Sequence, residues 1–286
     1  MLVKEYYSPV FLEDALHQMN EPGQVKALAG GTDLAISLNE RTIRPDAVVD
    51  LSGIEELKRI EMIGEDLHIG SMATFAQIAE DEVVKAMCPM LAAAALSVGS
   101  PQVRNLGTIG GNLANAATAA DTVPALMAAD AKAVVRKEGG ERILPVTEIP
   151  CGLNKTVLEP NELICEFILR PAKGSFTDFE KVGRRKALAI SRINMAIVLE
   201  RENDVITKAA LAYGAVGKTA YRASALETYL TGRKIDADTI DGACELAEQI
   251  VTEVLNGRST TPYKKKIASA VLRRALIKAS GGGEEK

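Results

Sequence analysis

Two short segments that each contain adjacent glycines are the residues of this chain best suited to hold a ligand. They are Ala29–Asp33, with the sequence Ala-Gly-Gly-Thr-Asp, and Gly107–Asn112, with the sequence Gly-Thr-Ile-Gly-Gly-Asn. Adjacent glycines remove Cβ from two successive residues, so that consecutive backbone N–H groups can close on an anion, as they do in phosphate-binding nests. One such segment is weak evidence, but two together suggest a diphosphate gripped from both sides.

Each segment taken alone also fits a turn that needs a positive φ. Thr32 and Thr108 add hydroxyl groups beside the glycines, Asn112 adds an amide, and no lysine is present to demand an unbridged triphosphate. This combination favours the diphosphate bridge of a dinucleotide. No Gly-x-Gly-x-x-Gly fingerprint occurs, which disfavours a standard nicotinamide-binding domain. Gly214–Thr219 ends like a phosphate-binding loop but lacks the required glycine spacing, so it predicts only a turn.

Two charged residues each allow a structural and a functional interpretation. Asp121 could cap the helix that Thr122–Pro124 begins, or it could accept hydrogen bonds from sugar or ribityl hydroxyls. Lys181 is a surface cation by default, and a functional role requires it to turn toward a bound cofactor. The sequence leaves both alternatives open.

Catalytic and metal-binding patterns are missing from the sequence. No Ser/His/Asp, Cys/His or paired-carboxylate arrangement stands out, and the two histidines are few for acid–base chemistry. The four cysteines are scattered and form no Cys-x-x-Cys pair, which predicts reduced core residues and no metal site. We therefore expect no catalytic side chain, and a bound cofactor that supplies the reactivity.

The composition is that of an ordinary globular protein, with 47% hydrophobic and 25% charged residues. A formal net charge of −4 argues against a nucleic-acid partner, which would need a clustered basic face. No apolar run approaches the roughly 20 residues of a membrane span, and the first residues lack the features of a signal peptide. These features predict a cytoplasmic protein with no membrane partner.

The elements that would position the glycine segments follow from the pattern of apolar residues. Helix and strand signals alternate over residues 1–56, which favours an α/β unit. In this unit a strand over Val25–Ala29 leads into the first glycine pair, and a short helix over Leu34–Asn39 follows it. The second glycine segment lies between an alanine-rich helix over Met90–Val98 and a helix that begins at Thr122.

After Arg170-Pro171 the pattern changes to long strands followed by long helices, which suggests a separate α+β domain. The length of 286 residues also favours two packed domains over one. The prediction is a domain over residues 1–172, with subdomains of about 1–56 and 57–172, and a domain over 173–286. The predicted strands and helices of the second domain are Phe176–Val182, Ile193–Leu199, Val205–Tyr213, Ala223–Leu230, Asp238–Leu255 and Pro262–Lys278.

Over nearly its whole length the chain resembles the FAD-binding subunit of molybdenum hydroxylases, the family of xanthine, carbon monoxide and nicotinate dehydrogenases. The resemblance implies an α+β fold. It consists of a two-part FAD-binding domain of the vanillyl-alcohol-oxidase-like (PCMH) type and a small C-terminal domain of the carbon monoxide dehydrogenase flavoprotein type, with a three-stranded sheet plus helices. The residues that carry the resemblance are Ala29–Asp33, the run Gly99–Asn112, Asp121 with Pro124, and Lys181 followed by Arg184-Arg185.

The same resemblance implies which residues bind FAD. Ala27–Leu34 resembles the first pyrophosphate loop of the family and Thr108–Asn112 the second. Asp121 resembles a ribityl or ring-edge contact, whereas Lys181 and Ile164, or Leu163 in its place, resemble residues near the isoalloxazine. The expected cofactor-binding residues are Ala27, Leu28, Ala29, Gly30, Gly31, Thr32, Asp33, Leu34, Thr108, Ile109, Gly110, Gly111, Asn112, Asp121, Ile164 and Lys181.

In that family a molybdopterin subunit hydroxylates the substrate, and electrons pass through two iron–sulfur clusters to the flavin and on to NAD+ or another acceptor. The resemblance thus implies FAD on this chain, and molybdopterin and iron–sulfur clusters on partner subunits. Four cysteines cannot ligate two such clusters, which agrees with this division. The implied function is that of a xanthine or purine dehydrogenase subunit. The alternatives are a nicotinate or carbon monoxide dehydrogenase flavoprotein subunit, a self-contained FAD-dependent oxidoreductase, and a non-catalytic nucleotide-binding module.

Overall fold

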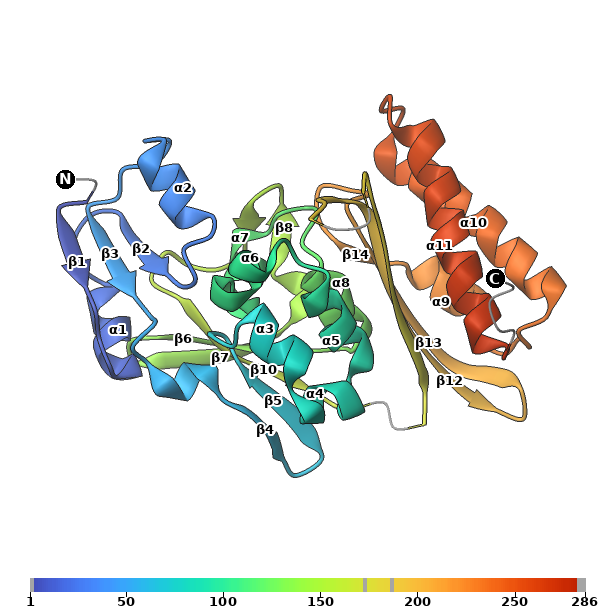
Figure 1. Cartoon of the computed structure of the whole chain (residues 1–286), viewed down its shortest axis with the longest axis horizontal. Helices are drawn as coiled ribbons and strands as arrows, with labels where there is room; N and C mark the ends of the chain where they lie inside the picture. Colours follow the sequence, from blue (N-terminus) through green and yellow to red (C-terminus); the bar gives the residue numbers. More distant parts are fainter. Residues whose placement is uncertain (1–2, 172–173, 186–187, 282–286) are drawn as a thin grey trace.

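The structure is a computed structural model that describes residues 3–171, 174–185 and 188–281 (Figure 1). Within these residues the chain forms three main sheets, each packed against helices, and one small two-stranded sheet. The predicted domain boundary between residues 172 and 173 lies outside the described residues. The mixture of parallel and antiparallel sheets with segregated helices confirms the predicted α+β class.

The N-terminal part is a parallel sheet with the strand order β1-β3-β2. Parallel neighbours need a crossover connection, and here short helices supply it. The predicted strand before the first glycine pair and the helix after it are confirmed. The first strand was not predicted, because two of its three residues are exposed and it has no apolar run. The elements are β1 (Glu5–Tyr7), α1 (Leu12–Gln18), β2 (Val25–Leu28), α2 (Leu34–Asn39) and β3 (Ala47–Asp50).

The middle part is an antiparallel sheet with the strand order β4-β5-β10-β6-β7. The long connection from β5 to β6 folds into short helices that pack on the sheet through one apolar core (Figure 1). Its elements are η1 (Glu55–Lys58), β4 (Ile60–Ile63), β5 (Asp66–Gly70), α3 (Phe75–Glu80), α4 (Glu82–Met87), α5 (Pro89–Leu96), α6 (Pro101–Leu106), α7 (Ile109–Asn115), α8 (Thr122–Ala128), β6 (Lys132–Lys137), β7 (Gly140–Pro145), η2 (Val146–Glu148), β8 (Pro150–Gly152), β9 (Lys155–Thr156) and β10 (Leu163–Leu169).

The helices of this connection are short because side-chain caps and prolines start new ones within a few residues. Thr74 begins α3 through a reciprocal capping box with Gln77. Asp81 ends that helix and at once caps α4 by accepting hydrogen bonds from two backbone N–H groups. Pro89 and Pro101 each stand at the first position of a helix, where no N–H is needed. The chain is thereby folded repeatedly over one face of the sheet.

The C-terminal part is an antiparallel sheet with the strand order β11-β12-β13-β14. The helices α9 to α11 cover one face, and α5 and α8 of the middle part pack on the other. The predicted three-stranded sheet therefore gains a fourth strand, β14, which has only two residues and forms by pairing with β13. The elements are β11 (Phe176–Gly183), β12 (Ser191–Glu202), β13 (Val205–Gly214), β14 (Tyr221–Arg222), α9 (Ser224–Leu230), α10 (Ala237–Leu255) and α11 (Thr261–Ala279).

The inner strand β12 of this sheet is apolar on both faces. Residues Ile193 and Ile197 pack against the C-terminal helices, whereas Ala196 and Val198 pack in the core of the middle part. A strand covered on both sides reads as a continuous apolar run, which is how β12 was predicted. The C-terminal sheet is thus the layer that joins the middle part to the last helices (Figure 1). Among the described residues no helix is long and apolar enough to cross a bilayer.

Candidate cofactor site

The two glycine segments, far apart in the sequence, lie beside one another in the structure. A Cβ atom on Gly30 would lie 1.8 Å from the carbonyl oxygen of Leu106, immediately before the second segment. A Cβ atom on Gly111 would lie 3.6 Å from the Cβ of Ala29. Both segments line one cavity of about 330 Å³. Only glycine allows the first segment to approach the backbone of the second this closely.

The first segment carries backbone donors that the protein itself does not use. It runs from the end of β2 to the start of α2, and Gly31 adopts a φ of +70°. Among the described residues, the N–H groups of Gly30, Gly31, Thr32 and Asp33 donate no hydrogen bond. Successive free N–H groups around a left-handed residue form a nest, a concave backbone site for an anion. This segment therefore has the donors that the sequence predicted.

The second segment is different, because its backbone donors from Ile109 to Asn112 are already paired. Ile109, Gly110 and Asn112 donate to the carbonyl oxygens of Ala73, Ser71 and Thr108, at 3.1, 2.8 and 3.0 Å. Gly111 donates to the Thr108 hydroxyl at 3.1 Å, which makes Thr108 the N-cap of α7. The expectation that the N–H groups of this segment are free to close on an anion is wrong for Ile109 to Asn112. The segment is the first turn of a helix rather than a loop, and its donors are satisfied by the cap and by the connection after β5.

The glycines of the second segment serve close packing. A Cβ atom on Gly110 would lie 2.6 Å from the Ser71 Cβ and 2.8 Å from the Ser71 carbonyl oxygen, so glycine lets α7 sit against the end of β5. Gly111 lines the cavity and, having no Cβ, adds no side chain to this wall. Asn112 accepts a hydrogen bond from the Thr122 hydroxyl at 2.7 Å, while its side-chain nitrogen donates to no atom of the described residues. Thus Asn112 offers the cavity a side-chain donor.

Lys26 was missed by the sequence reasoning and also lines this cavity. It lies on β2, where alternation places it on the face opposite to buried Val25. Within the described part of the chain it has no ion-pair partner. A cation and free backbone donors in one cavity suit a ligand that carries negative charge. The sequence signal that could have identified Lys26 is its outward position on the strand that leads into the glycine pair.

Asp121 and Lys181 do not line this cavity; they bind each other. The ammonium of Lys181 donates to Asp121 Oδ2 at 2.6 Å and to the carbonyl oxygen of Ser97 at 2.8 Å. Asp121 Oδ1 accepts hydrogen bonds from the Ser191 hydroxyl at 2.5 Å and from the Asn194 amide at 2.7 Å. Asp121 makes no capping hydrogen bond to α8, and Lys181 is not a surface cation, since its side chain is only 15% exposed. The capping interpretation of Asp121 and the surface interpretation of Lys181 are therefore wrong.

Ser191 and Asn194 were not identified from the sequence. Asn194 is fully buried and interrupts the apolar run of β12, and a polar residue at such a position indicates a buried hydrogen-bond partner. The partner itself, Asp121, is 73 residues away in the sequence and could not be named from it. Lys181 lines a further cavity of about 820 Å³ together with Ser97, Gly99 and Arg104. The segment that contains these residues also contributes Val98 to the cavity of the glycine segments.

Ile164 lies on β10, opposite Val135, and is only 6% exposed. It packs in the core of the middle part, whereas its neighbour Leu163 packs in the N-terminal core. The contact of Ile164 with a cofactor stays a prediction.

The cavity of the glycine segments is lined by most of the predicted site residues: Ala27, Ala29, Gly30, Gly31, Thr32, Asp33, Leu34, Thr108, Gly111 and Asn112. Outside its lining are Leu28, Ile109, Gly110, Asp121, Ile164 and Lys181.

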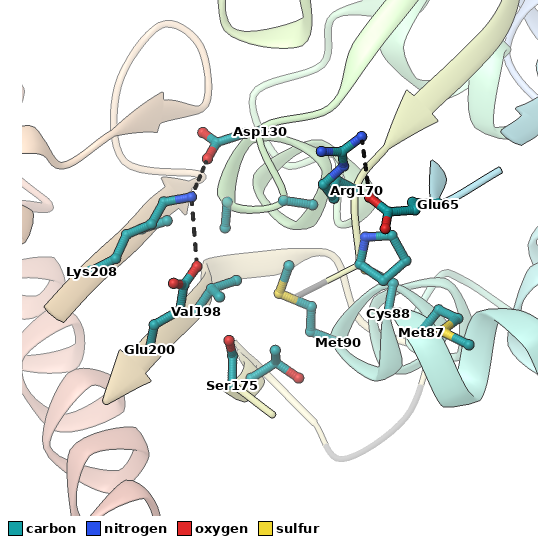
Figure 2. Close-up of a pocket in the computed structure, with 15 residues that line it drawn as sticks. Glu65, Met87, Cys88, Met90, Asp130, Arg170, Ser175, Val198, Glu200 and Lys208 are labelled. Carbon is teal, nitrogen blue, oxygen red and sulfur yellow. Dashed lines mark ion pairs between the residues drawn. The ribbon is translucent and has the colours of Figure 1, made fainter. Parts of the chain in front are cut away.

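A separate crevice of about 440 Å³ lies between the helices of the middle part and the C-terminal sheet (Figure 2). Its charged rims are internally matched, because Lys208 lies 3.3 Å from Asp130 and Arg170 lies 3.8 Å from Glu65. Burial raises the pKa of the Cys88 thiol in this crevice to about 12, so it is no nucleophile at neutral pH. None of the residues that line the crevice, all of which are described, offers an unmatched charge or a reactive group. It is the weaker candidate for a functional site.

Two family profiles match this chain. The family described as "FAD binding domain in molybdopterin dehydrogenase" matches residues 2–171, and the "CO dehydrogenase flavoprotein C-terminal domain" matches residues 179–279. The nicotinate dehydrogenase FAD-subunit of Eubacterium barkeri is 33% identical over 96% of this chain and 95% of that protein. The xanthine dehydrogenase FAD-binding subunit of Escherichia coli O157:H7 is 29% identical over 97% of each.

A solved structure resembles the fold along its length. A chain of carbon monoxide dehydrogenase from Hydrogenophaga pseudoflava superposes with a TM-score of 0.90. The alignment covers 98% of both chains at 30% identity. The similarity therefore extends over all three main sheets.

Proposed function

Because the chain belongs to the family of FAD-binding subunits of molybdenum hydroxylases, we propose that it relays electrons between two partners. It would receive them from the iron–sulfur clusters of a partner subunit and pass them through FAD to NAD+ or another acceptor. A molybdopterin subunit of the same complex would carry out the hydroxylation. The names of the relatives, which are dehydrogenase subunits, support this division of labour.

The first glycine segment carries the proposal, because it fits the diphosphate of FAD. Four successive N–H groups, from Gly30 to Asp33, lack an acceptor within the described residues and border the same cavity as Lys26. The Asn112 amide adds a donor from the opposite wall. A diphosphate supplies the acceptor oxygens and the negative charge that these groups lack. The fit depends on atoms of this chain and is independent of the family likeness.

The roles of the site residues follow from their chemistry. Gly30–Asp33 and Lys26 would bind the phosphates, and Thr32 would add a hydroxyl donor. Gly111 and Asn112 would form the facing wall. Lys181 would lie at the flavin end, next to the segment that borders both cavities. FAD, when bound, supplies the redox chemistry, so the chain needs to bind and orient it and to set the charge around it.

The domain organisation and surroundings are part of the proposal. The FAD-binding domain would span residues 1–172, with subdomains of about 1–56 and 57–172, and a C-terminal domain would span 173–286. The subunit would work in the cytoplasm, in a complex with its iron–sulfur and molybdopterin partners. The relatives' names, which describe FAD subunits of dehydrogenases, support the complex, and the family matches over residues 2–171 and 179–279 support the division of the chain.

A purine such as xanthine is the first candidate for the hydroxylated substrate of the complex, and nicotinate is the second. The observation in favour of the second is the relative with 33% identity, a nicotinate dehydrogenase subunit. Both are N-heterocycles, and the residues that would select between them belong to a partner subunit. Assaying the purified complex with each compound decides between the two.

The proposal is tested on the full chain purified alone and with its partners. The chain should be yellow, lose its flavin absorbance on reduction with dithionite, and release FAD on denaturation. Molybdenum and iron should copurify when the partner subunits are produced with it. A colourless chain that takes up no added FAD contradicts the proposal. A yellow chain that never associates with a molybdenum and iron protein would instead support a self-contained flavoenzyme.

A further inference from the structure

Asp121 is the centre of a buried polar network that joins the middle part to the C-terminal sheet. Its carboxylate is 7% exposed and accepts hydrogen bonds from Lys181 on β11 and from Ser191 and Asn194 on β12. All three donors come from the C-terminal sheet, whereas Asp121 stands at the start of α8. Both of its oxygens therefore have donors from this chain, and a sugar hydroxyl is not needed to satisfy them.

A β-bulge brings these donors to one face of the sheet. Lys181 and Asn194 are direct cross-strand partners and so share a face. Ser191 is three residues before Asn194, and regular alternation would place it on the opposite face. The register shifts by one residue at Arg192, so that Ser191 pairs with Gly183 and returns to the face of Lys181. Bulges commonly re-aim a side chain in this way.

Asn194 keeps its place in the network at an energetic cost. Its nitrogen donates to Asp121 and to the carbonyl oxygen of Ala120, while its buried oxygen accepts no hydrogen bond from the described residues. An unpaired buried acceptor is unfavourable. Gly214 pairs with Asn194 on the neighbouring strand, and a Cβ atom on it would lie 2.1 Å from that oxygen. Glycine is therefore needed at this position. The fold accepts these constraints in order to keep a donor on Asp121.

Lys181 has one N–H group left for a ligand. An ammonium has three donors, and within the described residues Lys181 uses two of them, on Asp121 and on Ser97. The same side chain lines the 820 Å³ cavity. Ser97 is adjacent to Val98, which lines the cavity of the glycine segments. The two hydrogen bonds therefore fix the position of the Lys181 ammonium. It lines the 820 Å³ cavity, which lies next to the cavity of the glycine segments.

We propose that Asp121, Ser191 and Asn194 are positioning residues that hold the Lys181 ammonium, as a partly neutralised charge, at the flavin end of the site and thereby set the reduction potential of the bound flavin. The inference rests on the function proposed above. It assigns the network to electron transfer, in addition to its evident role in joining the two parts of the chain.

The charges of the network predict that replacing Lys181 and replacing Asp121 shift the midpoint potential of the flavin in opposite directions. Reduction adds negative charge to a bound ring, so a nearby cation favours the reduced form and a nearby anion opposes it. Lys181→Met removes the cation and leaves the Asp121 carboxylate, which should lower the midpoint potential. Asp121→Asn leaves the ammonium without its counter-charge, which should raise it. Ser191→Ala removes one hydrogen-bond donor from the Asp121 carboxylate, so the carboxylate offsets the Lys181 charge more fully. This variant should lower the midpoint potential, but by less than Lys181→Met.

The experiment measures the midpoint potential of FAD on the full chain by dye-equilibrated reductive titration at one pH. Lys278→Met is the matched control. Lys278 pairs with Asp178 and Glu180 of β11, the strand that also carries Lys181. Glu180 adjoins Lys181 in this strand and so points to the opposite face of the sheet. The potential of Lys278→Met should equal that of the wild type. The double variant Lys181→Met/Asp121→Asn should lie between the two single variants.

Opposite signs for Lys181→Met and Asp121→Asn, with an unchanged control, support the inference. Shifts of the same sign, or no shift in a variant that keeps FAD, overturn it and leave the proposed function intact. Failure of the wild-type chain to bind FAD overturns both. Should Asp121→Asn fail to fold, Ser191→Ala still decides, because a raised or unchanged potential contradicts the inference. Urea unfolding of each apoprotein separates stability from these effects.

Discussion

The two glycine segments have similar sequences but different structures. The first, Ala29–Asp33, is an irregular connection whose N–H groups from Gly30 onward are unpaired within the described residues. The second, Gly107–Asn112, begins a helix, and its N–H groups from Ile109 onward are paired with Thr108 and with the connection after β5. Glycine gives the first segment its close approach and its left-handed residue, and gives the second its packing. The site is therefore one anion nest facing one packed wall, in place of two equivalent loops.

Gly30→Ala tests the close approach and should have the largest effect. The new Cβ would lie 1.8 Å from the Leu106 oxygen, so the first segment must move away from the wall. Overpacking costs about 3 kcal/mol at its upper range, which corresponds to roughly 100-fold weaker FAD binding. Fluorescence titration of the apoprotein with FAD measures it. Gly140→Ala is the control, since its Cβ would meet only the flexible Lys137 side chain at 3.6 Å. Equal affinity of the two variants would contradict the account.

Gly110→Ala should affect the fold more than the ligand. Its Cβ would press on the Ser71 backbone behind the wall, at 2.8 Å from the carbonyl oxygen. The free energy of unfolding of the apoprotein should fall by about 2 kcal/mol, as for other overpacked sites. Urea unfolding without FAD measures this loss. An unchanged unfolding midpoint together with lost FAD binding would mean that Gly110 touches the cofactor and that the wall has been misassigned.

Gly31→Ala tests the left-handed residue of the nest. The space can hold a methyl group, because the nearest atom, Leu28 Cδ1, is 3.4 Å away, but the φ of +70° is unfavourable for alanine. The strain is about 1 kcal/mol and should weaken FAD binding roughly fivefold. Gly31→Asn should bind more tightly than Gly31→Ala, since asparagine tolerates this conformation better. The reverse order in the titration would show that φ at this position is irrelevant to binding.

The two threonines give the smallest and most specific contrast. Thr108→Val removes the cap of α7 and should lower the free energy of unfolding by about 1 kcal/mol while FAD affinity stays nearly constant. Thr32→Val should leave the stability unchanged and weaken FAD binding. Paired urea and FAD titrations measure both quantities. If the two variants exchange these effects, the assignment of nest and wall is reversed.

Much of the fold was predictable because its signals are local. The helix α2 has the bounds that its apolar pattern predicts, and the strand β2 begins at the predicted residue, Val25. The start of α3 at Thr74 and the turn between β12 and β13 follow from capping and turn residues, and Asn203 and Asp204 in that turn both have positive φ. In contrast, β14 has only two residues and depends on pairing with β13.

The site was predicted less completely, because its decisive contacts join distant parts of the chain. The sequence identified both glycine segments, but the acceptors that use the donors of the second, Ser71 and Ala73, belong to another element. It also identified Asp121 and Lys181 separately, yet their ion pair spans 60 residues. Residue type predicts which groups can bind, whereas tertiary structure decides which of them are already paired.

Hydrogen–deuterium exchange, followed by mass spectrometry with and without FAD, tests the central claim most directly. Peptides that cover residues 28–34 and 107–113 report the two segments separately. The account predicts that the first peptide exchanges rapidly in the apoprotein and slowly with FAD, because its N–H groups gain phosphate acceptors, while the second is protected in both states. A first peptide that is already protected without FAD, or protection by FAD confined to the second, would contradict it.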